Sequence, residues 1–235
     1  MRLDKFFSDA GLLSRRDCAR AVSRGEITVN GTTATKSDMK INEEKDTVTL
    51  RGERISFSKY VYVMLNKPEG YISATTDGRA PVVTELLPDD LRRRGLFPAG
   101  RLDKDTTGFM LLTDDGQTAH KLLTPRHHVE KIYEFSLDVP LPLGAEERFL
   151  AGVLLGDEMC KPAGLSLATD RKSGSITLTE GKYHQIKRMM QKEGSNVVAL
   201  RRVSFGGIPL DSALAPGEWR FLTAGETALL LSENK

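Results

Sequence analysis

The chain has 235 residues and a formal net charge of +2, because its 34 basic side chains nearly balance 32 acidic ones. This length accommodates one large domain or two smaller ones with a real hydrophobic core. No stretch approaches the roughly 18 consecutive apolar residues of a membrane span, and the N-terminus lacks the apolar segment of a signal peptide. We therefore expect a cytoplasmic protein without a membrane partner, in which any nucleic-acid surface comes from local basic clusters.

Neither the cysteines nor the histidines predict a metal site. Cys18 and Cys160 lie far apart in the sequence and are expected to be reduced thiols. The adjacent His127 and His128 belong to a set of only four histidines, and no Cys or carboxylate completes a known ligand spacing. We predict no bound metal.

Residues 1–50 are predicted to form a unit of their own. A first helix is indicated by apolar side chains at helical spacing, namely Leu3, Phe6, Phe7 and Ala10. Ser14 is a good N-cap for a second helix over residues 15–24, and a short hairpin follows over residues 27–35 with the turn Asn30-Gly31. Residues 1–36 contain seven Lys/Arg against four Asp/Glu, so this stretch is locally +3.

The order helix, helix, then Arg-Gly-Glu-Ile-Thr-Val-Asn-Gly over residues 24–31 resembles the S4 RNA-binding domain. In that family, basic side chains of the second helix and the hairpin contact RNA. The resemblance implies the following phosphate contacts here: Arg2, Lys5, Arg15, Arg16, Arg20 and Lys36. Such contacts position RNA and give an affinity that depends on salt, without reading sequence.

A polar stretch over residues 51–59 is predicted to be a linker, and residues 60–235 a second domain. This domain opens with a predicted strand over residues 60–65 that runs into Asn66-Lys67-Pro68-Glu-Gly70. Pro68 and Gly70 are typical turn residues. Lys67, at the end of the strand, is expected near an RNA phosphate.

Residues 100–108 read Gly-Arg-Leu-Asp-Lys-Asp-Thr-Thr-Gly, directly before an apolar run typical of a buried strand. Asp103 stands between two basic residues, and a neighbouring cation keeps a carboxylate ionised, as a nucleophile or base requires. A plain turn explains the loop equally well by itself. A phosphate-handling Asp-x-Asp-x-Thr loop is less favoured, because Pro98 and Gly100 make the preceding residues a poor buried strand.

Two later segments combine basic and aromatic residues. Lys131-x-Tyr133 leads into a predicted strand over residues 133–137. Glu-Gly-Lys-Tyr-His-Gln-Ile-Lys over residues 180–187 leads into a predicted amphipathic helix over residues 184–193. A further strand, over residues 197–203, contains Leu200, Arg201 and Arg202.

In their order, these segments resemble the pseudouridine synthases, specifically the RsuA branch that modifies ribosomal RNA. The resemblance implies that Asp103 is catalytic, as nucleophile or as base, and that Lys187 forms a salt bridge with it. It also implies that Tyr133 stacks on the target uracil and that Leu200 packs under it. Arg101 is expected to occupy the space that the flipped base leaves, and Arg201 to touch RNA. Asp105 is expected to order the loop through hydrogen bonds with Thr106 or Thr107. No cofactor is implied.

The fold class predicted in this way is α+β, with a small S4-like α/β domain before a catalytic domain built on a mixed, mainly antiparallel sheet. We expect a monomer that isomerises one uridine of ribosomal RNA, in the small-subunit 16S molecule. A related enzyme of 23S RNA, a non-catalytic S4-type assembly factor and a glycoside hydrolase with paired carboxylates remain as alternatives.

Overall fold

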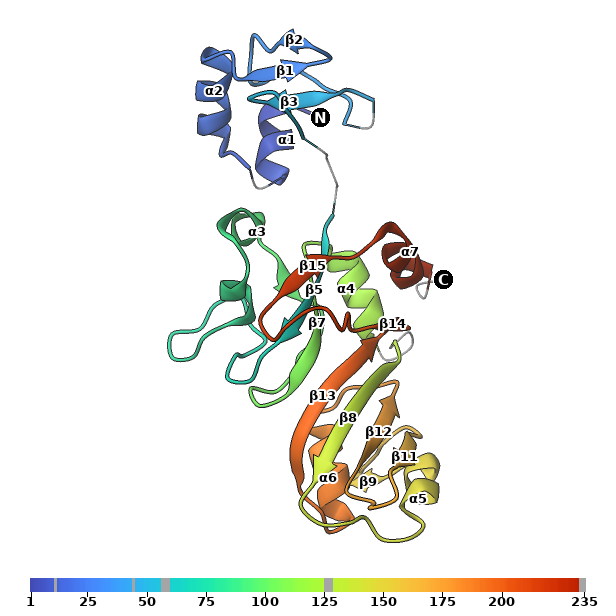
Figure 1. Cartoon of the computed structure of the whole chain (residues 1–235). Coiled ribbons are helices and arrows are strands. Elements are labelled where there is room, and N and C mark those ends of the chain that lie inside the picture. Colours follow the sequence, from blue (N-terminus) through green and yellow to red (C-terminus); the bar gives the residue numbers. More distant parts are fainter. Residues whose placement is uncertain (11, 44, 56–59, 125–128, 233–235) are drawn as a thin grey trace. The chain divides into compact units, whose positions relative to one another are not determined.

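The computed structural model describes residues 1–10, 12–43, 45–55, 60–124 and 129–232. The chain divides into two compact units (Figure 1). One comprises residues 1–61 and 87–96, and the other comprises residues 62–86 and 97–235.

The first unit combines helices with a four-stranded antiparallel sheet in the order β2-β1-β3-β4. Its elements are α1 (Leu3–Asp9), α2 (Arg15–Ser23), β1 (Ile27–Val29), β2 (Thr32–Thr33), β3 (Val48–Leu50), β4 (Glu53–Ile55) and α3 (Asp89–Arg94). Ser14 caps α2 by accepting a hydrogen bond from the backbone N–H of Asp17. Phe6, Phe7 and Cys18 belong to one buried core with β1. The two predicted helices and the hairpin strand 27–29 are confirmed.

Part of the predicted linker is wrong. Residues 53–55 form β4, which pairs with β3 and extends the first sheet beyond residue 50. The polar sequence was compatible with a linker because both residues of β4 before Ile55 are exposed, as at a sheet edge. Residues 56–59 lie outside the described part of the chain. In other respects the boundaries 1–50, 51–59 and 60–235 stay predictions.

The second unit is built on a nine-stranded sheet whose main path runs β11-β12-β8-β13-β7-β5-β15. Its strands are β5 (Tyr62–Lys67), β6 (Phe97–Pro98), β7 (Thr107–Thr113), β8 (Lys131–Leu137), β11 (Gly164–Leu167), β12 (Ser173–Leu178), β13 (Val197–Phe205), β14 (Ile208–Pro209) and β15 (Trp219–Phe221). β13 and β7 pair in parallel, and the other pairs of this sheet are antiparallel. This confirms the predicted fold class.

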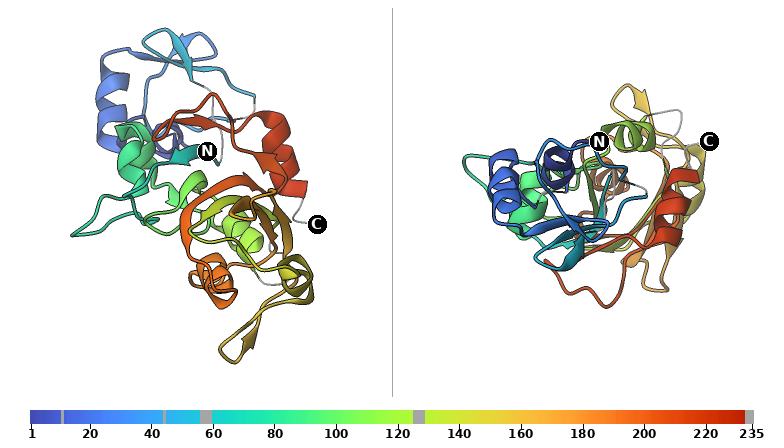
Figure 2. Two further views of the ribbon diagram at one scale, coloured as in Figure 1. Left: turned by 60° about the horizontal axis from the view of Figure 1, so that its bottom comes forward. Right: turned by 90° about the horizontal axis from the view of Figure 1, so that it is seen from above.

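Shorter elements accompany the large sheet. They are a 3₁₀ turn (Val83–Leu86), α4 (Gly116–Leu123), α5 (Ala145–Ala151), the separate hairpin β9 (Leu154–Leu155) and β10 (Glu158–Met159), α6 (Gln185–Lys192) and α7 (Ala224–Ser232). α6 packs against β13 and α7 packs beside β14 (Figures 1 and 2). Among the described residues, no helix is long and apolar enough to cross a membrane.

The centre of the sheet is its most apolar part. Every residue of β5 is buried, and so is β7 from Gly108 onward. Such runs, apolar on both faces, are typical of strands covered on both sides. The N-terminal end of β7 is fixed by this core and directly follows the loop that carries Asp103.

Gly108 allows β13 to approach β7 directly after that loop. It lies opposite Arg202 in the parallel pair and has φ +96°. A Cβ at this position would lie 2.2 Å from the carbonyl oxygen of Arg202. The carbonyl belongs to the backbone of β13, so no side-chain rotation relieves this overlap.

Gly108→Ala is therefore expected to lower the free energy of unfolding by more than about 2 kcal/mol, through steric overlap and an unfavourable φ. Equilibrium urea unfolding measures this. The matched control is Gly116→Ala in the first turn of α4, where a Cβ meets no atom of the described residues within 4 Å. Equal stability of the two variants would contradict the predicted close approach of β7 and β13.

Candidate active site

Asp103 lies in the loop between β6 and β7 with its side chain 30% exposed. The ammonium Nζ of Lys187, on α6, lies 3.0 Å from Asp103 Oδ2. The same Nζ donates a hydrogen bond to Asp105 Oδ1 at 2.5 Å. On the other side of the carboxylate, His184 Nε2 lies 3.4 Å from Asp103 Oδ1. Two carboxylates from one loop thus share one cation from a helix about eighty residues later.

Lys187 is a full positive charge at neutral pH. Partial burial favours its neutral form, but the hydrogen bonds to Asp105 and Asp103 outweigh burial and raise its pKa. Burial likewise opposes ionisation of Asp105, and the hydrogen bond and charge of Lys187 lower the pKa of that carboxyl below its usual value. An opposite charge at this distance favours the ionised form of a carboxylate.

The role expected for Asp105 needs correction. In place of a hydrogen bond with Thr106 or Thr107, it forms the shorter of the two Lys187 contacts. The sequence could not show this, because the partner is distant along the chain and comes close only when α6 packs on the sheet. Asp105 therefore orders the loop through an ion pair.

These groups line a pocket of about 390 Å³. Its walls are formed by Glu69, Gly70, Asp103, Lys104, Asp105, His184 and Lys187. The residues come from three separate segments, which are the turn after β5, the Asp103 loop and the start of α6. A pocket with convergent charged groups is the default candidate for a binding site.

The prediction that Lys67 contacts RNA phosphate is wrong. Its side chain is completely buried. Its Nζ donates hydrogen bonds to three backbone carbonyls, those of Thr106 at 2.7 Å, Pro68 at 3.1 Å and Lys104 at 3.2 Å. Two of these carbonyls belong to the Asp103 loop, so Lys67 holds the loop from beneath. Its place at a strand end was compatible with either a surface or a buried position.

The turn after β5 supports the same loop through further hydrogen bonds. The hydroxyl of Ser73 donates to the carbonyl of Leu102 at 2.7 Å and accepts from its N–H at 2.8 Å. The N–H of Gly70 donates to the carbonyl of Lys104 at 2.9 Å. Asp103 is thus bracketed by anchored backbone groups, which restricts the positions that its carboxylate can take. No local sequence feature marks Ser73, because its hydrogen-bond partner Leu102 is 29 residues away.

Tyr133 and Leu200 lie on the adjacent strands β8 and β13. Tyr133 is 8% exposed and Leu200 is 7% exposed. Tyr133 is opposite Arg202, whose buried guanidinium donates from Nε to the carbonyl of Phe109 at 2.6 Å. Among the described residues that line the Asp103 pocket, neither Tyr133 nor Leu200 is found. Their contacts with a uracil stay predictions.

Arg101 and Arg201 are both exposed. Arg101 lies in the Asp103 loop, two residues before the carboxylate. Arg201 is opposite Thr107 in the parallel pair, at the end of that loop. The backbone brings both cations to the neighbourhood of Asp103, although neither lines the pocket itself.

The basic residues proposed for the first unit are all exposed. Two of them form ion pairs with nearby acidic side chains. Arg2, at the N-cap of α1, pairs with Asp4 at 2.7 Å, and Arg20 pairs with Asp17 on α2. These two cations are therefore partly neutralised, whereas Lys5, Arg15, Arg16 and Lys36 are the more available for an anion.

In the part of the chain that the structure describes, no group of three or more His, Cys, Asp or Glu side chains is placed to hold a metal. His127 and His128 lie outside the described residues. Cys18 and Cys160 are free, buried thiols, and burial raises the pKa of each.

The chain matches two family models. Residues 61–153 match the RNA pseudouridylate synthase family, and residues 1–48 match the S4 domain. An uncharacterized RNA pseudouridine synthase of Bacillus subtilis, YtzG, is 43% identical over 98% of both chains. The chain belongs to the RNA pseudouridine synthases.

Two further relatives agree with this assignment. The ribosomal small subunit pseudouridine synthase A of Escherichia coli is 42% identical over 97% of this chain and 99% of its own length. A solved pseudouridylate synthase structure superimposes with a TM-score of 0.69 at 36% identity, covering 98% of this chain and 99% of that one. The resemblance drawn from the ordered motifs is confirmed, and the chain is an RNA pseudouridine synthase.

The buried ammonium of Lys67 gives a prediction for stability against pH. Burial lowers the pKa of Lys67 to about 8, from 10.5 in an exposed chain. This difference corresponds to roughly 3 kcal/mol of destabilisation by the charged form. The destabilisation is fully present below pH 8 and is relieved between pH 8 and 10.5, because there the folded protein has lost a proton that the unfolded chain still holds.

Lys67→Met removes this titration while filling a similar volume. The free energy of unfolding of the unmodified protein is expected to rise relative to the variant as the pH increases from 8 to 10. Urea unfolding at several pH values tests this. A constant difference between the two proteins across that range would show that Lys67 has an ordinary pKa and is not buried as described.

Proposed function

We propose that the chain converts a uridine of the small-subunit 16S ribosomal RNA into pseudouridine, with Asp103 as the catalytic residue. The observation that carries the proposal is the Asp103 carboxylate, held 3.0 Å from the Lys187 ammonium at a pocket on the family's fold. The choice of 16S RNA is supported by the Escherichia coli relative, whose name assigns it to the ribosomal small subunit.

The reaction requires a charged carboxylate but no external reagent. The C1′–N1 bond of uridine breaks, the uracil rotates, and C1′ forms a new bond to C5. The proton on C5 is lost and N1 gains one, so atoms and electrons balance without a redox cofactor. Asp103 acts either as nucleophile at the sugar or as base, and both roles require an ionised carboxylate.

The target base must leave the stack before it reaches Asp103, at a cost of a few kcal/mol. We assign stacking on the flipped uracil to Tyr133 and packing beneath it to Leu200. Both are largely buried in the free protein, so the base contacts only the exposed edge of each side chain. Arg101 takes the place of the flipped base in the RNA, and Arg201 contacts a neighbouring phosphate.

The first unit is proposed to hold the RNA through phosphate contacts. The basic side chains assigned to this are Arg2, Lys5, Arg15, Arg16, Arg20 and Lys36. Because such contacts release counterions, they make affinity depend on salt and contribute little to sequence choice. We further propose that the enzyme acts as a monomer in the cytoplasm.

Asp103→Asn is expected to abolish tritium release from a 16S RNA transcript labelled at uracil C5. RNA affinity should remain within about twofold, because one neutralised carboxylate outside the phosphate contacts changes little. Lys187→Met should lower turnover by about 10²-fold or more, and Lys187→Arg by less, since it keeps the charge. Asp90→Asn, in the first turn of α3, serves as a control with ordinary turnover. Full activity of Asp103→Asn would refute the assignment.

Arg15 and Arg16 give a separate test of the first unit. Replacing both by Ala is expected to reduce the slope of log affinity against log salt by about two, since each phosphate contact contributes about one. Filter binding of the same transcript at several salt concentrations measures the slope. Arg24→Ala, at the C-cap of the same helix but outside the proposed set, is the control. An unchanged slope in the double variant would contradict the proposed phosphate contacts of Arg15 and Arg16.

A further inference from the structure

An exposed aromatic ring stands beside the Asp103 carboxylate. The ring of Tyr183 stacks on that of His184, with centroids 3.9 Å apart and planes inclined by 15°. His184 Nε2 in turn lies 3.4 Å from Asp103 Oδ1. Tyr183 is nevertheless 75% exposed. The stacked pair therefore extends the wall of the active-site pocket outward to solvent.

The backbone below these rings is held rigidly. His184 adopts φ +47°, which is uncommon for a residue with a side chain and persists only where surrounding contacts enforce it. The buried amide of Gln185 supplies such contacts. Its Oε1 accepts from the N–H of Lys182 at 3.0 Å, and its Nε2 donates to Glu180 Oε1 at 2.5 Å. Tyr183 is thus a large exposed ring on a fixed turn, and its side chain is not part of the buried core.

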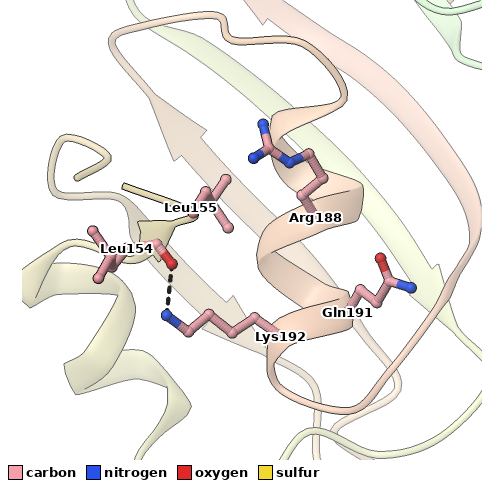
Figure 3. Close-up of a pocket in the computed structure, with 6 residues that line it drawn as sticks. Leu154, Leu155, Arg188, Gln191 and Lys192 are labelled. Atoms are coloured by element: carbon pink, nitrogen blue, oxygen red, sulfur yellow. Dashed lines mark hydrogen bonds between the residues drawn. The ribbon is translucent and has the colours of Figure 1, made fainter. Parts of the chain in front are cut away.

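Cations continue from this ring pair along α6. Arg188 donates from Nη1 to the carbonyl of Tyr183 at 3.5 Å, and Lys192 follows one helical turn later. Both line a second pocket of about 340 Å³, together with Leu154, Leu155, Gly156 and Gln191 (Figure 3). Lys192 reaches across this pocket to the carbonyl of Leu154 at 2.6 Å. The pocket therefore combines two positive charges with apolar side chains.

We propose that this surface, formed by Tyr183, His184, Arg188 and Lys192, binds the RNA strand next to the flipped uridine. A base adjacent to the target stacks on Tyr183, and the strand continues over Arg188 and Lys192 toward the second pocket. The inference rests on the proposed function, because it takes the uridine at Asp103 as its starting point.

The chemistry of the surface favours single-stranded RNA as its occupant. Exposed aromatic rings beside cations are typical of proteins that bind single strands, since every base has a flat face and every linkage a charge. The surface is also continuous with the Asp103 pocket through His184, which lines that pocket and stacks on Tyr183. Loss of one stacking ring commonly reduces affinity by roughly 5- to 150-fold.

Steady-state kinetics with a 16S RNA transcript tritiated at uracil C5 test the proposal. Tyr183→Ala is expected to raise KM at least fivefold while kcat at saturating RNA changes less than twofold. Tyr183→Phe keeps the ring and should recover most of the lost KM, whereas Tyr183→Leu should not. The control is Phe221→Ala, which removes another exposed ring, on β15, and should leave KM unchanged. Thermal unfolding verifies that each variant is folded.

A substrate with the neighbouring base removed tests stacking directly. In a short hairpin around the modified uridine, an abasic nucleotide on the stacked side should raise KM for the unmodified enzyme as much as Tyr183→Ala does. With this abasic substrate, Tyr183→Ala should have the same KM as the unmodified enzyme. Arg188→Gln should lower the salt slope of RNA binding by about one. Lys172→Gln, which removes an exposed cation directly before β12, should not.

Three results would overturn the proposal. They are an unchanged KM for Tyr183→Ala, a loss confined to kcat, and additive effects of the variant and the abasic nucleotide. A loss confined to kcat would show that Tyr183 acts through His184 on the reacting groups. Failure of the proposed function is distinguishable, because then the unmodified enzyme would release no tritium from the transcript at all.

Discussion

The site depends on one ammonium group that two carboxylates share. Asp103 and Asp105 belong to the same short loop, and a cation between two carboxylates offsets their mutual repulsion. Lys187 supplies that cation, at 3.0 Å from one carboxylate and 2.5 Å from the other. Because Lys187 comes from α6, this cation reaches the loop only when the helix packs on β13.

A second lysine keeps the loop in place at an energetic cost. The buried Lys67 donates hydrogen bonds to backbone carbonyls, and burial lowers its pKa to about 8. Burial of a charge in this way destabilises a fold, and such a cost is found where the group holds a functional segment in place. Here it fixes the backbone on both sides of Asp105, next to the point where Gly108 lets β13 approach β7. Lys187 thus supplies the positive charge beside the two carboxylates, and Lys67 holds the backbone of their loop.

Local features of the fold were predictable from the sequence, and contacts between distant segments were not. The α1 and α2 helices follow from apolar spacing and from the Ser14 cap, which act within a few residues. The presence of a loop directly before the buried strand β7 follows from the bracketing glycines and the apolar run behind them. By contrast, the burial of Lys67, the Lys187 contact of Asp105 and the anchoring by Ser73 each depend on a partner that only tertiary packing brings near. A lysine at a strand end has the same local sequence whether it faces solvent or the core.

Asp103 is proposed to modify one uridine in small-subunit ribosomal RNA. The decisive measurement maps pseudouridines in ribosomal RNA from cells that lack this protein, and from the same cells supplied with the unmodified chain or with Asp103→Asn. We expect that one pseudouridine of 16S RNA disappears with the protein, returns with the unmodified chain and stays absent with the variant. An unchanged 16S map, or restoration by Asp103→Asn, would contradict it.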